Sequence, residues 1–163
     1  MRSLFTIILL FLVTTFYCSP QLYYKGNKLK IYAAVQHVNR ILNDTNFYNQ
    51  IAQIKRFDNS KYTGQEIAEY IRHSDLVIEV KEAFMPIANA STKVPYRIKV
   101  SIFNFSSDLS TATNTLIHEI VHAVDLQDGD YDFTHSSNNN DDGSQDNTAP
   151  WVIGAIAEEF AKF

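Results

Sequence analysis

The sequence predicts an α+β domain, because stretches with helical spacing of apolar residues occur beside a stretch with strand-like alternation. Residues 28–42, 110–129 and 148–163 carry apolar side chains at helical spacing. Residues 97–103 instead alternate polar and apolar side chains, which is typical of a strand with one buried face. The chain has 163 residues, of which 45% are hydrophobic and 20% are charged. This composition suits one compact domain.

The first 20 residues are predicted to be a secretory signal peptide. Arg2 precedes an apolar run over residues 4–16, and the next charged residue is Lys25. The apolar run is shorter than the roughly 20 residues that a membrane-spanning helix needs. We therefore expect the protein to be exported and secreted.

Cleavage is expected between Cys18 and Gln21, which leaves a single domain over residues 21–163. An uncleaved anchor and a lipidated Cys18 are the alternatives. Because Cys18 is the only cysteine, the mature domain cannot form a disulfide, and a bound metal would help to stabilise it.

The net charge of −4 is unevenly distributed along the chain. Residues 1–99 hold 13 of the 14 lysines and arginines but only 7 acidic residues, whereas 11 acidic residues follow Val100. An acidic C-terminal half argues against nucleic-acid binding. The expected partner is a protein or peptide substrate, and no stable membrane association is expected once the signal is removed.

The remaining elements follow from local patterns. A second short helix is predicted around Phe47 and Ile51, and Thr63 with Glu66 forms a capping box that begins a third helix. His73 is expected at the C-terminus of that third helix, where it suits the helix dipole, and His37 is expected at the surface. Residues 76–80 are predicted to form a short strand and residues 85–96 a loop.

The helix over residues 110–129 contains the pattern that carries chemistry, His118-Glu119-Ile120-Val121-His122. Residues four apart lie on one face of a helix, so His118 and His122 can present two imidazole nitrogens to one metal ion. Zinc accepts such nitrogens at about 2.0–2.1 Å and keeps a position for water in catalytic sites. Glu119 follows about 100° around the helix, close enough to accept a proton from that water.

The rest of this helix has one face suited to packing in a core and one face suited to chemistry. Asp108 or Ser110 can cap its N-terminus, and Gly129 is placed to close its C-terminus. One arc of the helix is apolar, and its members are Ala112, Leu116, Ile117, Ile120, Val121 and Val124. The opposite arc is polar, and its members are Thr111, Thr115, His118, Glu119, His122 and Asp125.

His118, Glu119 and His122 match the central motif of the zincin metallopeptidases, and the chain resembles that family over these five positions. The resemblance implies a zincin-like fold, with a small, mostly antiparallel sheet packed on the active-site helix and additional N-terminal and C-terminal helices. It also implies peptide-bond hydrolysis by zinc-activated water, with Glu119 as the general base. Residues 97–103 would then be the edge strand over the cleft, available to pair with an extended substrate.

The third zinc ligand is predicted to be His135. The metzincin pattern would require glycine at position 125 and a third ligand at position 128, and this chain has Asp125 and Asp128 there. The run from His122 to Asp125 looks more like that of gluzincin-type toxin peptidases. In such a layout the third ligand is a glutamate on a later helix, for which Glu158 and Glu159 are candidates. Asp128 remains a further candidate. Asp125 suits a role that orients one imidazole.

Residues 125–148 form a long polar stretch with seven aspartates. Residues 138–143 are similar to the start of a calcium loop, but Ala149 stands where a calcium loop has its twelfth-position glutamate, so calcium is only weakly supported. The function predicted from the sequence is a secreted zinc metalloendopeptidase with one zinc ion. The alternative is a non-hydrolytic secreted zinc- or calcium-binding module.

Overall fold

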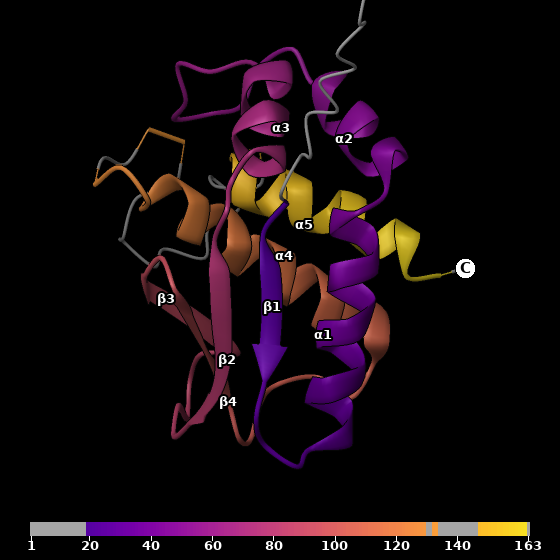
Figure 1. The fold of residues 1–163 in the computed structure, drawn as a ribbon, viewed down its shortest axis with the longest axis vertical. Helices are drawn as coiled ribbons and strands as arrows, with labels where there is room; N and C mark the ends of the chain where they lie inside the picture. The colour runs from indigo at the N-terminus through magenta and orange to yellow at the C-terminus, as the bar shows by residue number, and fades with distance from the viewer. Residues whose placement is uncertain (1–18, 130–131, 134–146, 163) are drawn as a thin grey trace, which may run out of the picture.

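A four-stranded mixed sheet lies against a layer of helices in the computed structural model (Figure 1). The structure describes residues 19–129, 132–133 and 147–162. The signal peptide predicted for residues 1–20 therefore lies almost wholly outside the described residues. No helix among the described residues is long and apolar enough to cross a membrane.

The sheet has the strand order β1-β2-β4-β3. Its strands are β1 (Gln21–Tyr24), β2 (Val77–Ala83), β3 (Ala90–Val94) and β4 (Arg97–Ser101). β1 pairs in parallel with β2, and β2 pairs in parallel with β4, whereas only β3 and β4 are antiparallel. The prediction of a mostly antiparallel sheet is therefore wrong. The helices between β1 and β2 carry the chain back to the end where β1 begins, which is what a parallel pair requires.

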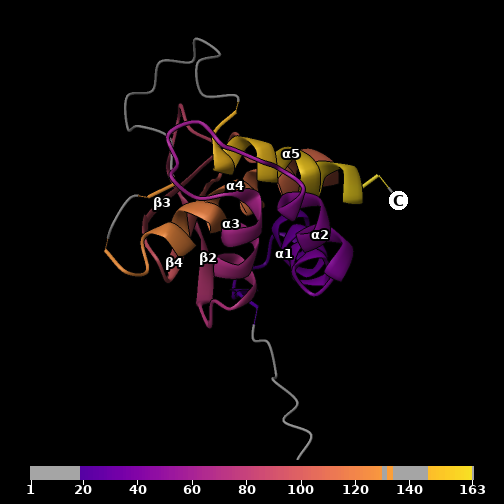
Figure 2. The same ribbon diagram turned by 90° about the horizontal axis from the view of Figure 1, so that it is seen from above.

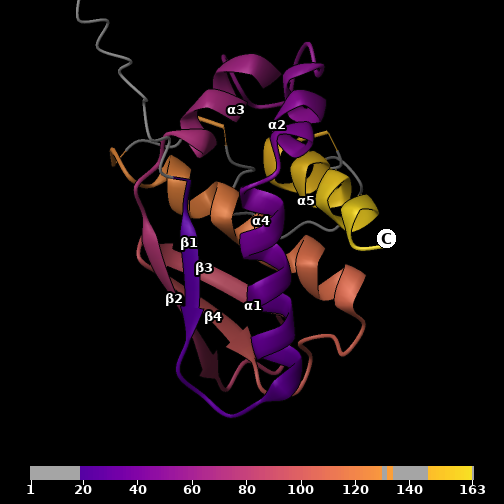
Figure 3. The same cartoon turned by 45° about the vertical axis from the view of Figure 1, so that its right-hand side comes forward.

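Five helices are described, and each lies in a region where the sequence predicts one. They are α1 (Leu29–Leu42), α2 (Thr45–Ala52), α3 (Gly64–Arg72), α4 (Leu109–Asp125) and α5 (Ala149–Phe160). α1 packs against β1 at one edge of the sheet, α4 packs on the same face against β3 and β4 at the other edge, and α5 lies along α4 (Figures 2 and 3). The α+β class is confirmed.

One face of the sheet is buried and the other is exposed. The strand side chains that point into the core are Leu22, Ile78, Val80, Ile98 and Val100. The alternate positions of the same strands, such as Val77, Lys81 and Lys99, are exposed. The helices therefore cover the inner face, and the outer face is open to solvent.

Two strands differ from the prediction. Residues 85–96 are not all loop, because Ala90–Val94 forms β3 at the edge of the sheet beside α4. Residues 97–103 do form a strand, β4, but it lies between β2 and β3, so it is not the edge strand that the resemblance implied. The five residues of β3 contain little apolar alternation, and their pairing with β4 is what makes them a strand.

His37 is buried in α1, and the prediction of a surface histidine is wrong. Its Nδ1 lies 2.9 Å from a guanidinium nitrogen of Arg40, one turn further along the helix. Burial, followed by the charge of Arg40, lowers the pKa of His37 below its usual value. Its buried position in α1 therefore favours the neutral form of this histidine.

The caps of α3 and α4 follow the predicted chemistry. Thr63 and Glu66 form the capping box of α3, and His73 occupies the C-cap of the same helix. Asp108 caps α4 by accepting a hydrogen bond of 2.8 Å from the backbone N–H of Thr111. α4 ends at Asp125, and Gly129 follows in a turn with a φ of 90°, a conformation that favours glycine.

α4 and α5 approach each other closely at Gly154. A β-carbon built on Gly154 would lie 2.6 Å from Oδ1 of Asn114 and 3.1 Å from its backbone oxygen. Glycine therefore permits the contact that brings α5 against the helix carrying the two histidines.

We expect Gly154→Ala to destabilise the protein, although alanine is the better helix former by roughly 1 kcal/mol. The added methyl must displace Asn114, and overpacking of this kind costs about 1–3 kcal/mol. Urea unfolding measures the difference. Asn114→Ala should make Gly154→Ala less damaging, because it removes the nearest atom. Equal losses in both backgrounds would show that this contact is not the cause.

Candidate metal centre

His118 and His122 lie on adjacent turns of α4, and their Nε2 atoms are 3.2 Å apart. Their rings are tilted by 65°, with centroids 5.0 Å apart, so the two nitrogens converge. Two nitrogen ligands at about 2.0–2.1 Å from one tetrahedral ion would be roughly 3.3 Å apart. The pair thus has the spacing that two zinc ligands need. Without a metal, the same distance allows one ring to donate a hydrogen bond to the other.

Glu119 is buried between α4 and the edge strand β3. Thr92 of β3 donates a hydrogen bond of 3.2 Å from its hydroxyl to the backbone oxygen of Glu119, which ties the strand to the helix. Burial raises the pKa of the Glu119 carboxyl to about 7, although hydrogen bonds from the side chain and backbone of Thr92 lower it. A divalent cation bound beside the carboxyl would act in the opposite direction to burial and lower this pKa.

The polar arc of α4 is only partly open to solvent. Glu119 and Asp125 are both buried, while His118 and His122 are only partly exposed. All six residues of the predicted apolar arc are buried, as expected. In its second half the helix is covered on most sides, and of residues 116–125 only the two histidines are partly exposed.

Trp151, in the first turn of α5, packs edge-on against His118 with ring centroids 4.7 Å apart. It is one of the exposed large hydrophobic residues. The indole thus forms an apolar wall beside the candidate metal position and restricts the ring of His118. Nothing in the local sequence of α5 indicated this contact, since it depends on how α5 packs on α4.

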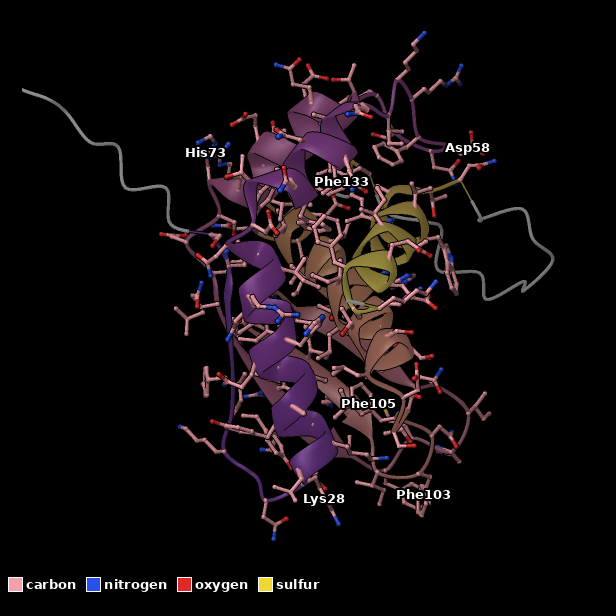
Figure 4. All side chains as sticks on the ribbon, turned by 90° about the vertical axis from the view of Figure 1, so that its right-hand side faces the viewer. Lys28, Asp58, His73, Phe103, Phe105 and Phe133 are labelled. Atoms are coloured by element: carbon pink, nitrogen blue, oxygen red, sulfur yellow. The ribbon has the colours of Figure 1, made fainter. Side chains whose placement is uncertain are left out.

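Asp125 fixes the chain that follows α4. Its Oδ1 accepts hydrogen bonds from the backbone N–H groups of Asp132 (2.9 Å) and Phe133 (3.2 Å). Asp132 also forms an ion pair with Lys61 at 2.8 Å. Phe133 is buried, and Figure 4 shows it in the interior of the molecule. The contacts of Asp125 thus hold the loop, and the predicted role in orienting an imidazole stays a prediction.

The two glutamates of α5 have other partners. Glu158 accepts a hydrogen bond of 2.8 Å from the amide of Asn114, and the hydroxyl of Ser110 lies 3.5 Å from it. Asn114 is one turn before His118, so Glu158 is directed toward the beginning of α4. Glu159 forms an ion pair with Lys162 at 2.6 Å. The contacts of α5 therefore do not favour the gluzincin-like alternative.

Asp128 is exposed and lies beyond the C-terminus of α4. It lines a groove of about 840 Å³ between α3 and the end of α4, together with Tyr70, His73 and Gln127. The structure thus places it at the α3 side of the helix.

Within the described residues, no group of three or more His, Cys, Asp and Glu side chains is arranged to hold a metal ion. His135, the predicted third ligand, lies outside the described residues, as do residues 138–143, the weak calcium candidate. The candidate metal centre within the described residues is therefore the pair His118 and His122, with Glu119 next to His118 on the same helix.

Comparisons of the chain with protein-family models, with curated proteins and with solved structures find no match. The function must therefore be inferred from the residues of this chain and from their geometry.

Proposed function

We propose that the chain is a secreted zinc-dependent metalloendopeptidase that holds one zinc ion on His118 and His122. The observation that carries the proposal is the 3.2 Å separation of the two Nε2 atoms, with the buried carboxyl of Glu119 on the same helix. A structural histidine pair has no need of an adjacent buried acid. The export signal predicted for residues 1–20 gives the proposed localisation.

Zinc in such a site supplies a Lewis acid and makes bound water more acidic. Glu119 accepts one proton from the attacking water, whose oxygen adds to the peptide carbonyl carbon. The same carboxyl then transfers the proton to the amine nitrogen as the carbon–nitrogen bond breaks, so that atoms and charge balance. Burial of Glu119 between α4 and β3 holds it in place for both transfers.

The edge strand β3 supports a peptide as the substrate. One side of β3 pairs with β4, and no strand of the described sheet lies on its other side. An extended peptide can add to such an edge through main-chain hydrogen bonds. The hydroxyl of Thr92 in β3 is hydrogen-bonded to the backbone oxygen of Glu119, so a peptide on this edge would run beside the histidine pair.

A non-hydrolytic zinc- or calcium-binding module remains the second candidate. The observation that favours it is that the described residues supply only two ligands, whereas catalytic zinc sites usually have three. The two candidates differ in whether Glu119 is needed for a reaction.

We expect the purified protein to bind one zinc ion per chain and to lose it when either histidine is replaced. His118→Ala and His122→Ala each remove one converging nitrogen, so zinc affinity should fall by at least about 100-fold. Metal analysis after dialysis against a zinc buffer measures this. His37→Ala is the control, because His37 is buried in α1, and it should keep the metal. Equal zinc content in all variants would refute the site.

Glu119→Gln should retain zinc and the fold but lose hydrolysis of an unstructured protein such as casein by about 1,000-fold or more. The amide keeps the shape of the side chain but cannot accept the proton. Glu158→Gln is the matched control, since Glu158 contacts Asn114 rather than the histidines. Near-normal hydrolysis by Glu119→Gln would rule out its role as general base. Zinc binding without any hydrolysis by the unaltered chain would favour the non-hydrolytic module.

His135→Ala should lower zinc affinity and hydrolysis together if His135 is the third ligand. His135 follows Phe133 by two residues, and the backbone N–H of Phe133 is hydrogen-bonded to Asp125, which lies three residues after His122 on α4. Asp128→Ala and Glu158→Ala should leave most of both properties. A loss of zinc in Glu158→Ala, with His135→Ala unaffected, would instead establish the gluzincin-like arrangement.

A further inference from the structure

Four large apolar side chains gather where the parallel strands end: Phe84, Ile87, Ile102 and Phe103, here called the apolar edge. Ile87 is 95% exposed, Phe84 73% and Phe103 60%. The rings of Phe84 and Phe103 meet edge-on with centroids 5.3 Å apart. Figure 4 shows Phe103 at the same end of the molecule as Lys28 and at the end opposite His73.

The topology of the sheet brings these residues together. β2 and β4 are parallel neighbours, and Ala83 pairs with Ser101 at their last positions. The residues that follow each strand, Phe84 and Ile102, therefore leave the sheet side by side. Ile87 belongs to the connection between β2 and β3, and β3 begins at this same edge because it is antiparallel to β4.

The apolar edge is held in place by hydrogen bonds. The buried hydroxyl of Ser101 donates to the backbone oxygen of Met85 (2.7 Å) and accepts from the backbone N–H of Phe103 (3.2 Å). The side-chain amide of Asn104 donates to the backbone oxygen of Pro86 at 2.8 Å. The loops thus present apolar side chains to water from a fixed backbone, and contiguous exposed patches of this kind mark interaction sites.

A row of lysines crosses the open face of the sheet next to the apolar edge. Lys81 pairs with Lys99 in the register of β2 and β4. Tyr24 pairs with Val80, so Lys25 follows at the level of Lys81. Neither Lys81 nor Lys99 forms an ion pair with another described residue. Like charges opposite each other in a sheet are destabilising, and an anionic surface would offset that repulsion.

We propose that the apolar edge inserts into the surface of a membrane that contains anionic lipid. Phenylalanine and isoleucine at a protruding edge, with lysines behind them, suit the boundary between acyl chains and headgroups. Strands rise about 3.3 Å per residue, so Lys81 stands roughly 10 Å behind Phe84, where its long side chain can reach the lipid phosphates.

A protein partner fits this surface less well, because lysine is depleted in protein–protein interfaces. The membrane proposal replaces the expectation from the sequence that the mature chain has no stable membrane association. It does not depend on the metal centre, because the apolar edge and the lysine row belong to the sheet and its loops, whereas the histidine pair lies on α4.

Tryptophan fluorescence of the full chain tests where the membrane contacts the protein. We expect the Phe84→Trp variant to shift to shorter wavelength with vesicles of phosphatidylcholine and about 30% phosphatidylglycerol, and to be quenched by brominated acyl chains. The unaltered chain gives the background of Trp151. Val77→Trp is the matched control, because Val77 is 61% exposed at the other end of β2. It should show neither change. Both variants contain residues 1–18, so this segment cannot account for a difference between them.

Two further variants test the two parts of the surface by vesicle sedimentation. Ile87→Ser should lower vesicle affinity by about tenfold or more, because the side chain no longer enters the apolar region. Since Ile87 is almost fully exposed, its replacement should leave folding unchanged. Replacing Lys81 and Lys99 by glutamine should lower affinity for anionic vesicles roughly tenfold, with little change for vesicles of phosphatidylcholine alone.

The proposal is wrong if Phe84→Trp responds to vesicles no more than the unaltered chain does, or if Val77→Trp responds equally. A shift of the Phe84→Trp emission with protein concentration, in the absence of lipid, would also overturn it. That result would make the apolar edge an interface between two copies of the chain.

Discussion

The burial of α4 is the constraint on which the rest of the structure depends. Its apolar positions, among them Leu116, Ile120 and Val121, are fully or almost fully buried. The sheet, α1 and α5 all pack against this helix. A helix fixed on so many sides cannot rotate, so the two imidazoles keep a constant direction. The 3.2 Å separation of their nitrogens is therefore a consequence of core packing as well as of helical spacing.

The same packing explains why Glu119 differs from its neighbours on the helix. Its 100° offset from His118 turns it toward β3, where it is buried, whereas the histidines face the side that solvent reaches. A carboxyl in such a position keeps its proton more readily than an exposed one, which is why its pKa rises to about 7. One helix thus places the two proposed metal ligands and the proposed proton-transfer group in different surroundings.

Local patterns predicted the helices and the histidine pair, because spacing and capping act within a few residues. The Asp108 cap and the capping box at Thr63 are of this kind. The strand β3, the parallel pairing of the sheet and the contact of Trp151 with His118 were not predicted. Each depends on partners far away in the sequence, which no window of local residues contains. The third ligand is a problem of the same long-range kind.

The charges of the chain are distributed over the fold in a way that the sequence only partly indicated. Three lysines of the first half, Lys25, Lys81 and Lys99, are placed by the parallel register on the open face of the sheet. Three of the described acids of the second half, Glu119, Asp125 and Glu158, belong to the helices α4 and α5. If the apolar edge enters an anionic membrane, the lysine row stands roughly 10 Å behind it, where the long side chains can reach the lipid phosphates. α4 then runs away from the lipid surface, and the candidate metal centre is held above it, where a peptide in solution can approach β3.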